Sequence, residues 1–568
     1  MFAWISLWPL FYMAERFKNS WKKLFFAGAS ASFFLCLFAF YWVIYTFTVF
    51  GGIHWLISSA IFVPYTLLLN LKFPVFMILF GISRRNHLKK YLPPAWFTAA
   101  TIALFSDFLT PQVFDWYWGN LLAGNNIIAQ IAEITGIYGL TFLLFAADYA
   151  LFYRLLSVRR IFIHLFHPGP KTAFRYSPVL LHGRAWKRLH THLRIWPATG
   201  MLLFVILFGI YRKLYFEDYQ KSLPTLRIAL IQPNTPLERP GGVKVLTRQY
   251  IENIMNKIIP DLAEKAWNAS GESLDLILLP ESAVPYYTTQ DTQITRGANL
   301  YSDSFRKMAE NLALKYNTNV FLNEIAVEPI EVDQQLYPGM YNATAFFSRA
   351  GIRESTYYKR VLVAFGEYVP LFSILENIGL SGILPAAIRF SGFQHGSVSN
   401  TISVSSDKAN SGKSLNPGVK EIYSFIPLIC YEVLFPEHVR SFFTEDQHPG
   451  FIVNLTQDGW YAKTAETYQH YELGRIRSIE FRKALARSTN TGTSGFVDLA
   501  GNYMIPVSGK TFSPLYEPYI QVGDLPVDNR SYITLYARFG NAWMLIILFL
   551  FFAHTAFHIF KRKFYAGR

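Results

Sequence analysis

The stretch Phe425-Ile-Pro-Leu-Ile-Cys430-Tyr431-Glu432 is an apolar run typical of a buried β-strand, and it ends in a thiol, a phenol and a carboxylate. A reactive side chain at the exit of a buried strand is fixed by the sheet and yet open to a substrate. The chain has two cysteines, and because Cys36 lies in an apolar run of membrane length, a disulfide between them is not expected. Cys430 is therefore predicted to be a free thiol, although a small core residue is an equally good interpretation of this stretch alone.

The composition of the chain indicates a membrane protein. Of its 568 residues 52% are hydrophobic and 17% aromatic, and the mean hydropathy is +0.20, which is too apolar for a purely soluble protein. The formal net charge of +15 is compatible with nucleic-acid binding, but the Lys and Arg residues lie beside the apolar segments. The charge is therefore interpreted as an orientation signal in a membrane, with contact to anionic lipids as a second use.

Several apolar segments approach or exceed the length of about 20 residues that a transmembrane helix needs. They lie near 24–49, 52–82, 94–110, 130–155, 195–214 and 541–560. Residues 2–13 are too short to span comfortably and are interpreted as the end of a span or as a re-entrant piece. The 52–82 run contains Asn70, Lys72 and Pro74, and we expect one long kinked helix there rather than two short ones.

Basic residues cluster at 16–23, 84–90, 154–194 and 561–563. If all four clusters are cytoplasmic, the spans alternate without contradiction and the large segment 215–540 lies on the outer side. The sequence thus predicts three regions: 1–214 with about six transmembrane helices, the first short or incomplete; 215–540 as an outer domain; and 541–568 as a transmembrane helix with a basic cytoplasmic tail.

From Leu226 onward, short β-branched runs alternate with polar stretches of helical character, which is typical of an α/β domain. Strands are predicted at 226–232, 274–279, 319–326, 341–349, 421–430, 450–455, 484–489 and 495–499, and helices near 244–267, 303–316 and 464–483. Residues 396–418 are rich in Ser, Asn, Gly and Lys without periodicity, and are predicted to be an exposed insertion.

Three titratable side chains stand at comparable places in this domain. Glu281 follows an apolar run at a predicted strand end, Lys359 follows Tyr357-Tyr358, and Cys430 ends the strand quoted above. Each alone is weak evidence, because a carboxylate at a strand end is more often a cap or a solvated loop group, and a lone lysine is usually a solvated charge. Together they supply a base, a cation and a thiol, the groups that activated-thiol catalysis requires.

This order of residues resembles the nitrilase superfamily, whose members carry a Glu-Lys-Cys triad, and more closely the bacterial apolipoprotein N-acyltransferases. The similar motifs extend over nearly the whole chain: Ile134-Thr-Gly-Ile-Tyr-Gly-Leu-Thr-Phe142, Pro280-Glu-Ser-Ala-Val-Pro285, Lys359 with Phe365-Gly-Glu-Tyr-Val-Pro370, Ile429-Cys-Tyr-Glu432, Asp458-Gly-Trp460, Arg487-Ser-Thr-Asn490 with Gly492, and Tyr536-Ala-Arg538. The resemblance implies an α/β fold, a nitrilase-like αββα sandwich on a polytopic helical membrane base. Family members usually begin with one more membrane helix, so we expect this chain to start near the family's second.

The resemblance also implies roles for single residues. The expected catalytic residues are Glu281, Lys359, Cys430 and Glu367, and the expected substrate-binding residues are Tyr431, Glu432 and Trp460. Glu367 and Glu432 are also expected to hold Lys359 or a neighbouring loop. For Tyr431 and Trp460, core packing is nearly as good an interpretation, because aromatic residues are frequent in this chain. No cofactor and no metal ion are implied.

The implied activity is a ping-pong acyl transfer. Cys430 attacks an acyl ester of a membrane phospholipid, a lysophospholipid leaves, and the thioester passes its acyl chain to the α-amino group of a diacylglyceryl-cysteine at the N-terminus of a lipoprotein. The implied location is a bacterial inner membrane, with the catalytic domain on the periplasmic side.

Two other function classes remain open at this point. A membrane-anchored amidase or nitrilase-type hydrolase would pass the acyl group to water, and a transporter or receptor would use intramembrane charges such as Lys72 and Asp107. His470 allows a Cys-His dyad or a metal site, but the sequence has no HExxH or CxxC spacing, and structural packing is the better interpretation.

Overall fold

The computed structural model describes residues 2–112, 114–166, 196–237, 246–332, 335–363, 366–368, 392–406, 421–528 and 532–566. Most of the basic cluster predicted at 154–194 lies outside this part. The chain forms two compact units. Unit 1 comprises Met1–Phe38, Pro64–Lys213 and Phe539–Arg568, and unit 2 comprises Ala39–Val63 and Leu214–Arg538.

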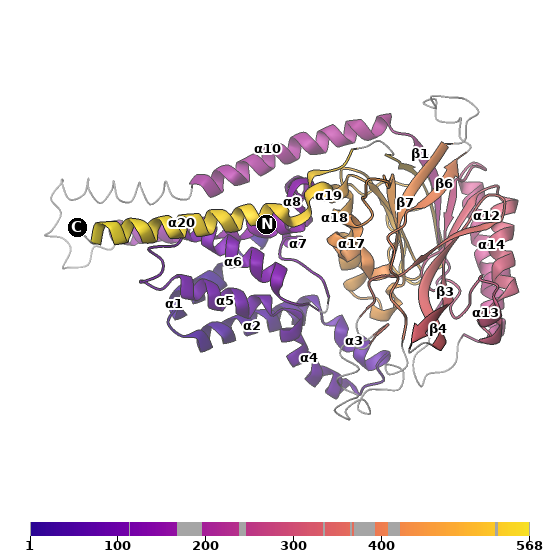
Figure 1. The fold of residues 1–568 in the computed structure, drawn as a ribbon, viewed down its shortest axis with the longest axis horizontal. Coiled ribbons are helices and arrows are strands. Elements are labelled where there is room, and N and C mark those ends of the chain that lie inside the picture. The colour runs from indigo at the N-terminus through magenta and orange to yellow at the C-terminus, as the bar shows by residue number, and fades with distance from the viewer. Residues whose placement is uncertain are drawn as a thin grey trace. The chain divides into compact units, whose positions relative to one another are not determined.

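Unit 1 is built from helices (Figure 1). They are α1 (Trp8–Phe17), most of α2 (Trp21–Ala39), α5 (Lys72–Ser83), α6 (Ala95–Leu109), α7 (Asn120–Ala123), α8 (Ala132–Phe166), most of α10 (Trp196–Tyr219) and α20 (Trp543–Ala566). In the described residues, four helical segments are long and apolar enough to cross a membrane, namely Trp21–Ala39, Ile128–Leu155, Trp196–Ser222 and Leu535–Tyr565. The bent pair Trp55–Leu68 and Lys72–Ser83 would be a fifth, and α6, in the predicted 94–110 span, is shorter at 15 residues.

The apolar run at 24–49 is not one helix, as the sequence had suggested. It breaks after Ala39, and α3 (Trp42–Val49) is a separate helix of unit 2. The Trp42 ring is 4% exposed and packs against Tyr461 with a centroid distance of 4.8 Å. Its apolar side chain thus fills a protein core, and hydropathy alone does not distinguish this from contact with lipid.

The run at 52–82 consists of α4 (Trp55–Leu69) and α5, joined with a bend of 43°. Lys72 at the start of α5 forms a fully buried ion pair with Asp107 at 2.8 Å. The other Asp107 oxygen accepts hydrogen bonds from the Trp118 N–H (3.0 Å) and the Thr141 hydroxyl (2.8 Å). The pair therefore joins α5, α6 and α8, a structural role that accounts for both charges without a transport path.

Unit 2 contains two mixed sheets that pack face to face (Figure 1). The first has the order β11-β1-β2-β3-β4-β5, with β1 (Thr225–Gln232), β2 (Leu276–Leu278), β3 (Asn319–Val332), β4 (Gln335–Phe347), β5 (Arg353–Tyr358) and β11 (Tyr519–Pro526). The second has the order β10-β9-β8-β7-β6, with β6 (Ile402–Ser406), β7 (Glu421–Ile429), β8 (Phe451–Thr456), β9 (Ala484–Thr489) and β10 (Gly495–Val497).

Helices cover the outer faces of both sheets of unit 2 (Figure 1). On the first sheet lie α11 (Arg248–Asn253), α12 (Ile259–Ala269), α13 (Gln293–Gly297) and α14 (Asp303–Lys315). On the second sheet lie α17 (Pro436–Arg440) and α18 (Glu466–Phe481). The short helix α19 (Leu535–Phe539) comes after β11 in the chain. Between the sheets, Phe425 of β7 packs against Phe321 of β3 with a ring distance of 5.0 Å. This arrangement confirms the predicted αββα sandwich.

One segment differs from the prediction of an exposed insertion at 396–418. Residues Ile402–Ser406 form β6, which pairs with β7 in antiparallel orientation. Ile402 and Val404 point inward and are 3% and 0% exposed. Two apolar residues at a spacing of two are sufficient for an edge strand, although the surrounding composition resembles a loop; residues 407–420 lie outside the described part.

Candidate active site

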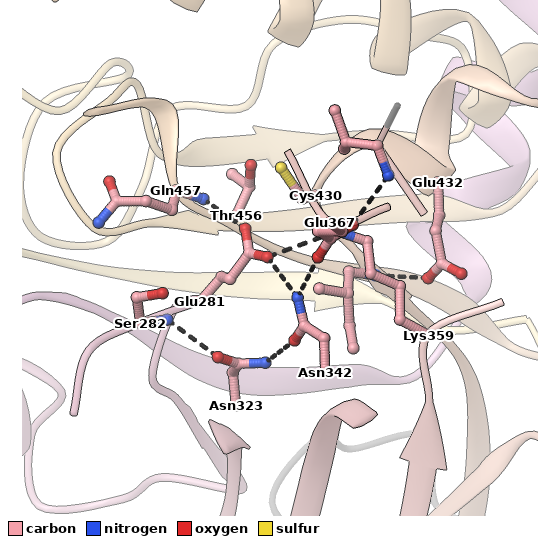
Figure 2. Close-up of polar contacts among 12 residues, drawn as sticks. Glu281, Ser282, Asn323, Asn342, Lys359, Glu367, Cys430, Glu432, Thr456 and Gln457 are labelled. Carbon is pink, nitrogen blue, oxygen red and sulfur yellow. Dashed lines mark hydrogen bonds and ion pairs between the residues drawn. The ribbon is translucent and has the colours of Figure 1, made fainter. Parts of the chain in front are cut away.

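The three predicted triad residues all lie just beyond the carboxyl ends of strands. Cys430 directly follows β7, Lys359 directly follows β5, and Glu281 follows β2 after Leu279 and Pro280. β2 and β5 point in the same direction because two antiparallel pairings separate β3 from β5. The strand ends of the two sheets therefore meet, and the structure brings the thiol, the ammonium group and the carboxylate together (Figure 2).

Cys430 has an unusual backbone conformation. Its φ is +52°, in the left-handed region that side-chain-bearing residues rarely adopt. The chain turns here from β7 into the short 3₁₀ helix Cys430–Leu434, and Asn454 of β8 donates a hydrogen bond of 3.1 Å to the Cys430 carbonyl. A strained turn at a strand exit is a known way to present a nucleophile to a substrate.

The Lys359 ammonium group is buried between two carboxylates. Its Nζ lies 2.9 Å from the Glu367 carboxylate and 3.5 Å from Glu281 Oε1. Burial disfavours the charge, but the two carboxylates outweigh burial and hold the pKa of Lys359 well above its ordinary value. Lys359 is therefore a fixed positive charge near Cys430.

Glu281 is held by a chain of hydrogen bonds (Figure 2). Its Oε2 accepts from the Gln457 N–H at 3.0 Å, and its Oε1 accepts from Asn342 Nδ2 at 2.8 Å. Asn342 Oδ1 in turn accepts from Asn323 Nδ2 at 2.7 Å, and Asn323 Oδ1 accepts from the Ser282 N–H at 2.9 Å. The carboxylate is thus fixed in orientation by groups from both sheets.

The pKa shifts of Glu281 and Cys430 favour Glu281 as the base that takes the thiol proton. Burial is the main cause that raises the pKa of Glu281, and Lys359 only partly opposes it. Burial, followed by the Glu281 charge, raises the pKa of Cys430 well above that of an ordinary thiol. The resting sulfur is therefore protonated, and its hydrogen-bond partner Glu281 is in place to take the proton.

Asn323 and Asn342 are site residues that the sequence reasoning did not identify. Both lie within long, largely apolar strands, β3 and β4, and both are buried. Buried amides must find hydrogen-bond partners, so an Asn inside an apolar strand is the signal that would have indicated them.

Glu432 is predicted both to contact substrate and to hold Lys359 or a neighbouring loop, and the structure shows which groups its carboxylate binds. Its carboxylate is fully buried and accepts hydrogen bonds from the Ile429 N–H (2.8 Å) and the Tyr357 hydroxyl (2.9 Å). It also accepts from the backbone N–H groups of Arg360 (2.7 Å) and Val361 (3.1 Å). The carboxylate joins the strand that precedes Cys430 to the turn that follows Lys359, and this geometry favours a positioning role over substrate contact.

We expect Glu432→Gln to lower the free energy of unfolding by about 2–4 kcal/mol, because the amide places an N–H group against buried donors. Denaturant unfolding in detergent micelles, followed by tryptophan fluorescence, measures this change. Glu445→Gln is the matched control, because Glu445 is exposed and its replacement is expected to change stability by less than about 0.5 kcal/mol. Equal stability of the two variants would contradict the positioning role.

Tyr431 and Trp460 lie on the turns that follow β7 and β8. The buried Tyr431 ring packs edge-on against Phe435 at 4.9 Å. Trp460 is 37% exposed, and its ring lies 4.7 Å from that of Phe50. Their predicted contact with substrate stays a prediction.

His470 belongs to a buried cluster with Asp458 and Glu466, whose candidate ligand atoms lie within 4.8 Å of one another. His470 Nδ1 is 3.2 Å from Asp458 Oδ1. Arg487 pairs with the same Asp458 carboxylate at 3.1 Å and already supplies a balancing cation. The cluster therefore does not need a metal ion to offset its charge.

Two models of known protein families match this chain. The model of the apolipoprotein N-acyltransferase N-terminal domain matches residues 1–150, and the model of the carbon-nitrogen hydrolases matches residues 227–510. The second match confirms the nitrilase-like fold predicted for the catalytic domain.

Similar proteins cover nearly the whole chain. Apolipoprotein N-acyltransferase 2 of Leptospira interrogans is 31% identical over 576 aligned positions, which cover 97% of this chain and 90% of that protein. Apolipoprotein N-acyltransferase of Bdellovibrio bacteriovorus is 25% identical and covers 97% of this chain and 88% of its own length. A solved amidase structure from Nesterenkonia sp. is 18% identical, with a TM-score of 0.33 over 56% of this chain and 96% of the amidase. The chain belongs to the apolipoprotein N-acyltransferase family.

Proposed function

We propose that this protein moves a fatty acyl chain from a phospholipid, through a thioester on Cys430, to the α-amino group of the N-terminal diacylglyceryl-cysteine of a lipoprotein. The observation that carries the proposal is the contact of the Cys430 thiol with the Glu281 carboxylate, beside the Lys359 ammonium group. Membership of the family supplies the substrate classes, and the span-length apolar helices support a location where both lipid substrates occur.

In the first half-reaction, Glu281 accepts the thiol proton while Cys430 Sγ attacks the ester carbonyl carbon. Lys359 and the backbone N–H of Tyr431 stabilise the negative oxygen of the tetrahedral intermediate. The ester C–O bond then breaks, and the leaving alcohol oxygen takes the proton from Glu281. The products are a lysophospholipid and a Cys430 thioester.

In the second half-reaction, the neutral amine of the acceptor attacks the thioester carbonyl carbon. Glu281 takes one proton from the amine nitrogen, the C–S bond breaks, and the sulfur recovers a proton from Glu281. An amide and a free thiol result. Glu367 is a positioning residue in this scheme, because its carboxylate holds the Lys359 ammonium group and also accepts the Val363 N–H at 2.9 Å.

A membrane setting suits both substrates, because moving an acyl chain into water costs about 0.8 kcal/mol per CH₂ group. Tyr431 and Trp460 are proposed to line the path of the acyl chain near the nucleophile. The proposed location is a bacterial inner membrane with unit 2 on the periplasmic side. The basic residues that flank the span-length segments, at 16–23, 84–90 and 561–563, support this orientation.

The test of this function separates transfer to an amine from transfer to water. The purified protein in detergent micelles is incubated with a phospholipid that carries a labelled acyl chain and with a synthetic peptide that begins with diacylglyceryl-cysteine. We expect a labelled amide with this peptide and none when its α-amino group is acetylated. Release of labelled fatty acid at the same rate with both peptides would instead support a hydrolase.

A further inference from the structure

Thr456 lies beside the proposed nucleophile, and neither half-reaction above uses it. It is the last residue of β8, which pairs in parallel with β7 so that Leu455 stands opposite Ile429. Cys430 and Thr456 are the next residues of the two strands and emerge side by side (Figure 2). Thr456 is fully buried, and its hydroxyl lies beside the Cys430 sulfur. Burial raises the pKa of the Cys430 thiol, and a hydrogen bond from the Thr456 hydroxyl lowers it.

The Thr456 hydroxyl also contacts a charged network on its other side. Its Oγ1 lies 3.2 Å from Asp458 Oδ1 and donates to it. The Asp458 carboxylate accepts two further hydrogen bonds from Arg487, at 3.1 and 3.2 Å, and contacts His470 Nδ1 at 3.2 Å. Burial disfavours the charge, but Arg487 and His470 outweigh burial and hold the pKa of Asp458 below its ordinary value. Asp458 is therefore an ionised acceptor.

The position of Asp458 is fixed by its surroundings. A Cβ atom added to Gly492 would lie 2.0 Å from Asp458 Oδ2, so only glycine fits at that point of the loop after β9. Arg487 is anchored separately, because its Nη1 donates to Asn454 Oδ1. Asn454 is the same residue that holds the Cys430 carbonyl. One buried network thus determines both the backbone of Cys430 and the place of the Thr456 hydroxyl.

A hydroxyl group has one proton to donate. While the sulfur is protonated, that proton is directed at Asp458. When Glu281 takes the thiol proton, the negative sulfur becomes a competing acceptor, and Asp458 keeps its hydrogen bonds from Arg487 if the hydroxyl turns away. The turn therefore costs little, and hydrogen bonds to charged acceptors are stronger than those between neutral groups.

We propose that Thr456 is a further catalytic residue, whose hydroxyl donates a hydrogen bond to Cys430 Sγ while the sulfur is negatively charged, and that Asp458 is the positioning residue that keeps this hydroxyl within reach. The inference rests on the proposed function, because only that function requires a Cys430 thiolate. The sulfur is then stabilised from both sheets, by Lys359 beyond β5 and by Thr456 of β8.

The test measures the ionisation of Cys430 directly, in a Cys36→Ser background where it is the only thiol. The variants are Thr456→Val, which replaces the hydroxyl by a methyl group of similar size, Thr456→Ala, which removes the hydroxyl without a new contact, and Thr456→Ser, which keeps it. Alkylation by iodoacetamide is followed against pH, and acyl-enzyme formation from phospholipid is followed by intact mass. The pH dependence of alkylation in the parent protein also depends on the charged or titratable groups that interact with the sulfur, namely Glu281, Lys359, Asp458 and Tyr461. Glu367, His470 and Arg487 interact in turn with these groups.

We expect Val and Ala to slow alkylation roughly ten- to a hundredfold at each pH below the midpoint, which corresponds to a rise of about one to two units in the pKa of the thiol, and to slow acyl-enzyme formation by a similar factor. Ser is expected to remain within about threefold of the parent. An unchanged alkylation profile in both Val and Ala would overturn the proposal, and so would an effect in Val alone, which would be steric. If the parent protein forms no acyl-enzyme, the proposed function fails, whereas the alkylation profiles still report whether Thr456 stabilises the thiolate.

Discussion

Replacement of Cys430 by Ala is expected to abolish acyl transfer, with a loss of at least about 10⁴-fold, while the protein remains folded in the membrane. Sγ is the atom that would form the thioester, and the other cysteine of the chain, Cys36, lies in α2 of unit 1. The side chain is small and buried, so its truncation removes one sulfur atom from the core. The resulting loss of stability is expected to be about 1 kcal/mol, too small to unfold the protein.

Intact-mass analysis after incubation with phospholipid alone measures this effect. Wild type is expected to gain the mass of one fatty acyl group, which hydroxylamine removes, and Cys430→Ala is expected to gain nothing. Cys36→Ala is the matched control and is expected to become acylated like wild type. Undiminished lipoprotein N-acylation by Cys430→Ala would rule out the nucleophile and return a purely binding role to consideration.

The central strands could be predicted from the sequence because they are buried on both faces. β7 is the clearest case, with unbroken burial from Phe425 to Ile429. Edge strands carry a weaker signal. β5 presents a largely polar, mostly half-buried sequence at one edge of the first sheet, and β6 stands in a Ser-rich context at an edge of the second. Such strands are defined by their pairing partner more than by their own composition.

Two members of the candidate triad were predictable for a related reason, since Glu281 and Cys430 follow strand ends that the sequence marks with an apolar run. Lys359 follows the polar edge strand β5, and only the motifs that resemble the family pointed to it. The groups that orient the triad were not predictable. Asn342 reaches Glu281 from β4, and Thr456 reaches Cys430 from β8. Their roles depend on which strands become neighbours, and a single sequence does not specify this. The same limit applies to α3, whose apolar side chains look like a membrane segment until the buried packing partner of Trp42 is known.

Glu281→Gln is expected to separate two effects of this carboxylate on the thiol. The Glu281 charge raises the pKa of Cys430, and Lys359 lowers it. Removal of that charge leaves Lys359 with less opposition, so the thiol of the variant should ionise at lower pH than in wild type. Iodoacetamide alkylation of Cys430 is therefore expected to shift to lower pH, because this reagent needs only the thiolate.

Acyl transfer is expected to respond in the opposite direction. In the first half-reaction the leaving alcohol oxygen needs a proton, and in the second the attacking amine must lose one. A Gln side chain can neither donate nor accept these protons. Acyl-enzyme formation should therefore fall by at least about 10³-fold despite the larger thiolate fraction. In wild type the rate should decline as the pH falls through the raised pKa of Glu281, because the protonated acid cannot accept the thiol proton.

The matched control for this variant is Glu367→Gln, which removes the other carboxylate at Lys359. It is expected to lose about ten- to a hundredfold, because Glu367 positions the ammonium group and transfers no proton. If Glu281 acted only through its charge, the extra thiolate in Glu281→Gln would speed acylation, and a labelled acyl-enzyme would accumulate at least as fast as in wild type. That outcome would exclude Glu281 as the base, whereas easier alkylation together with blocked acylation requires a carboxylate that carries the proton.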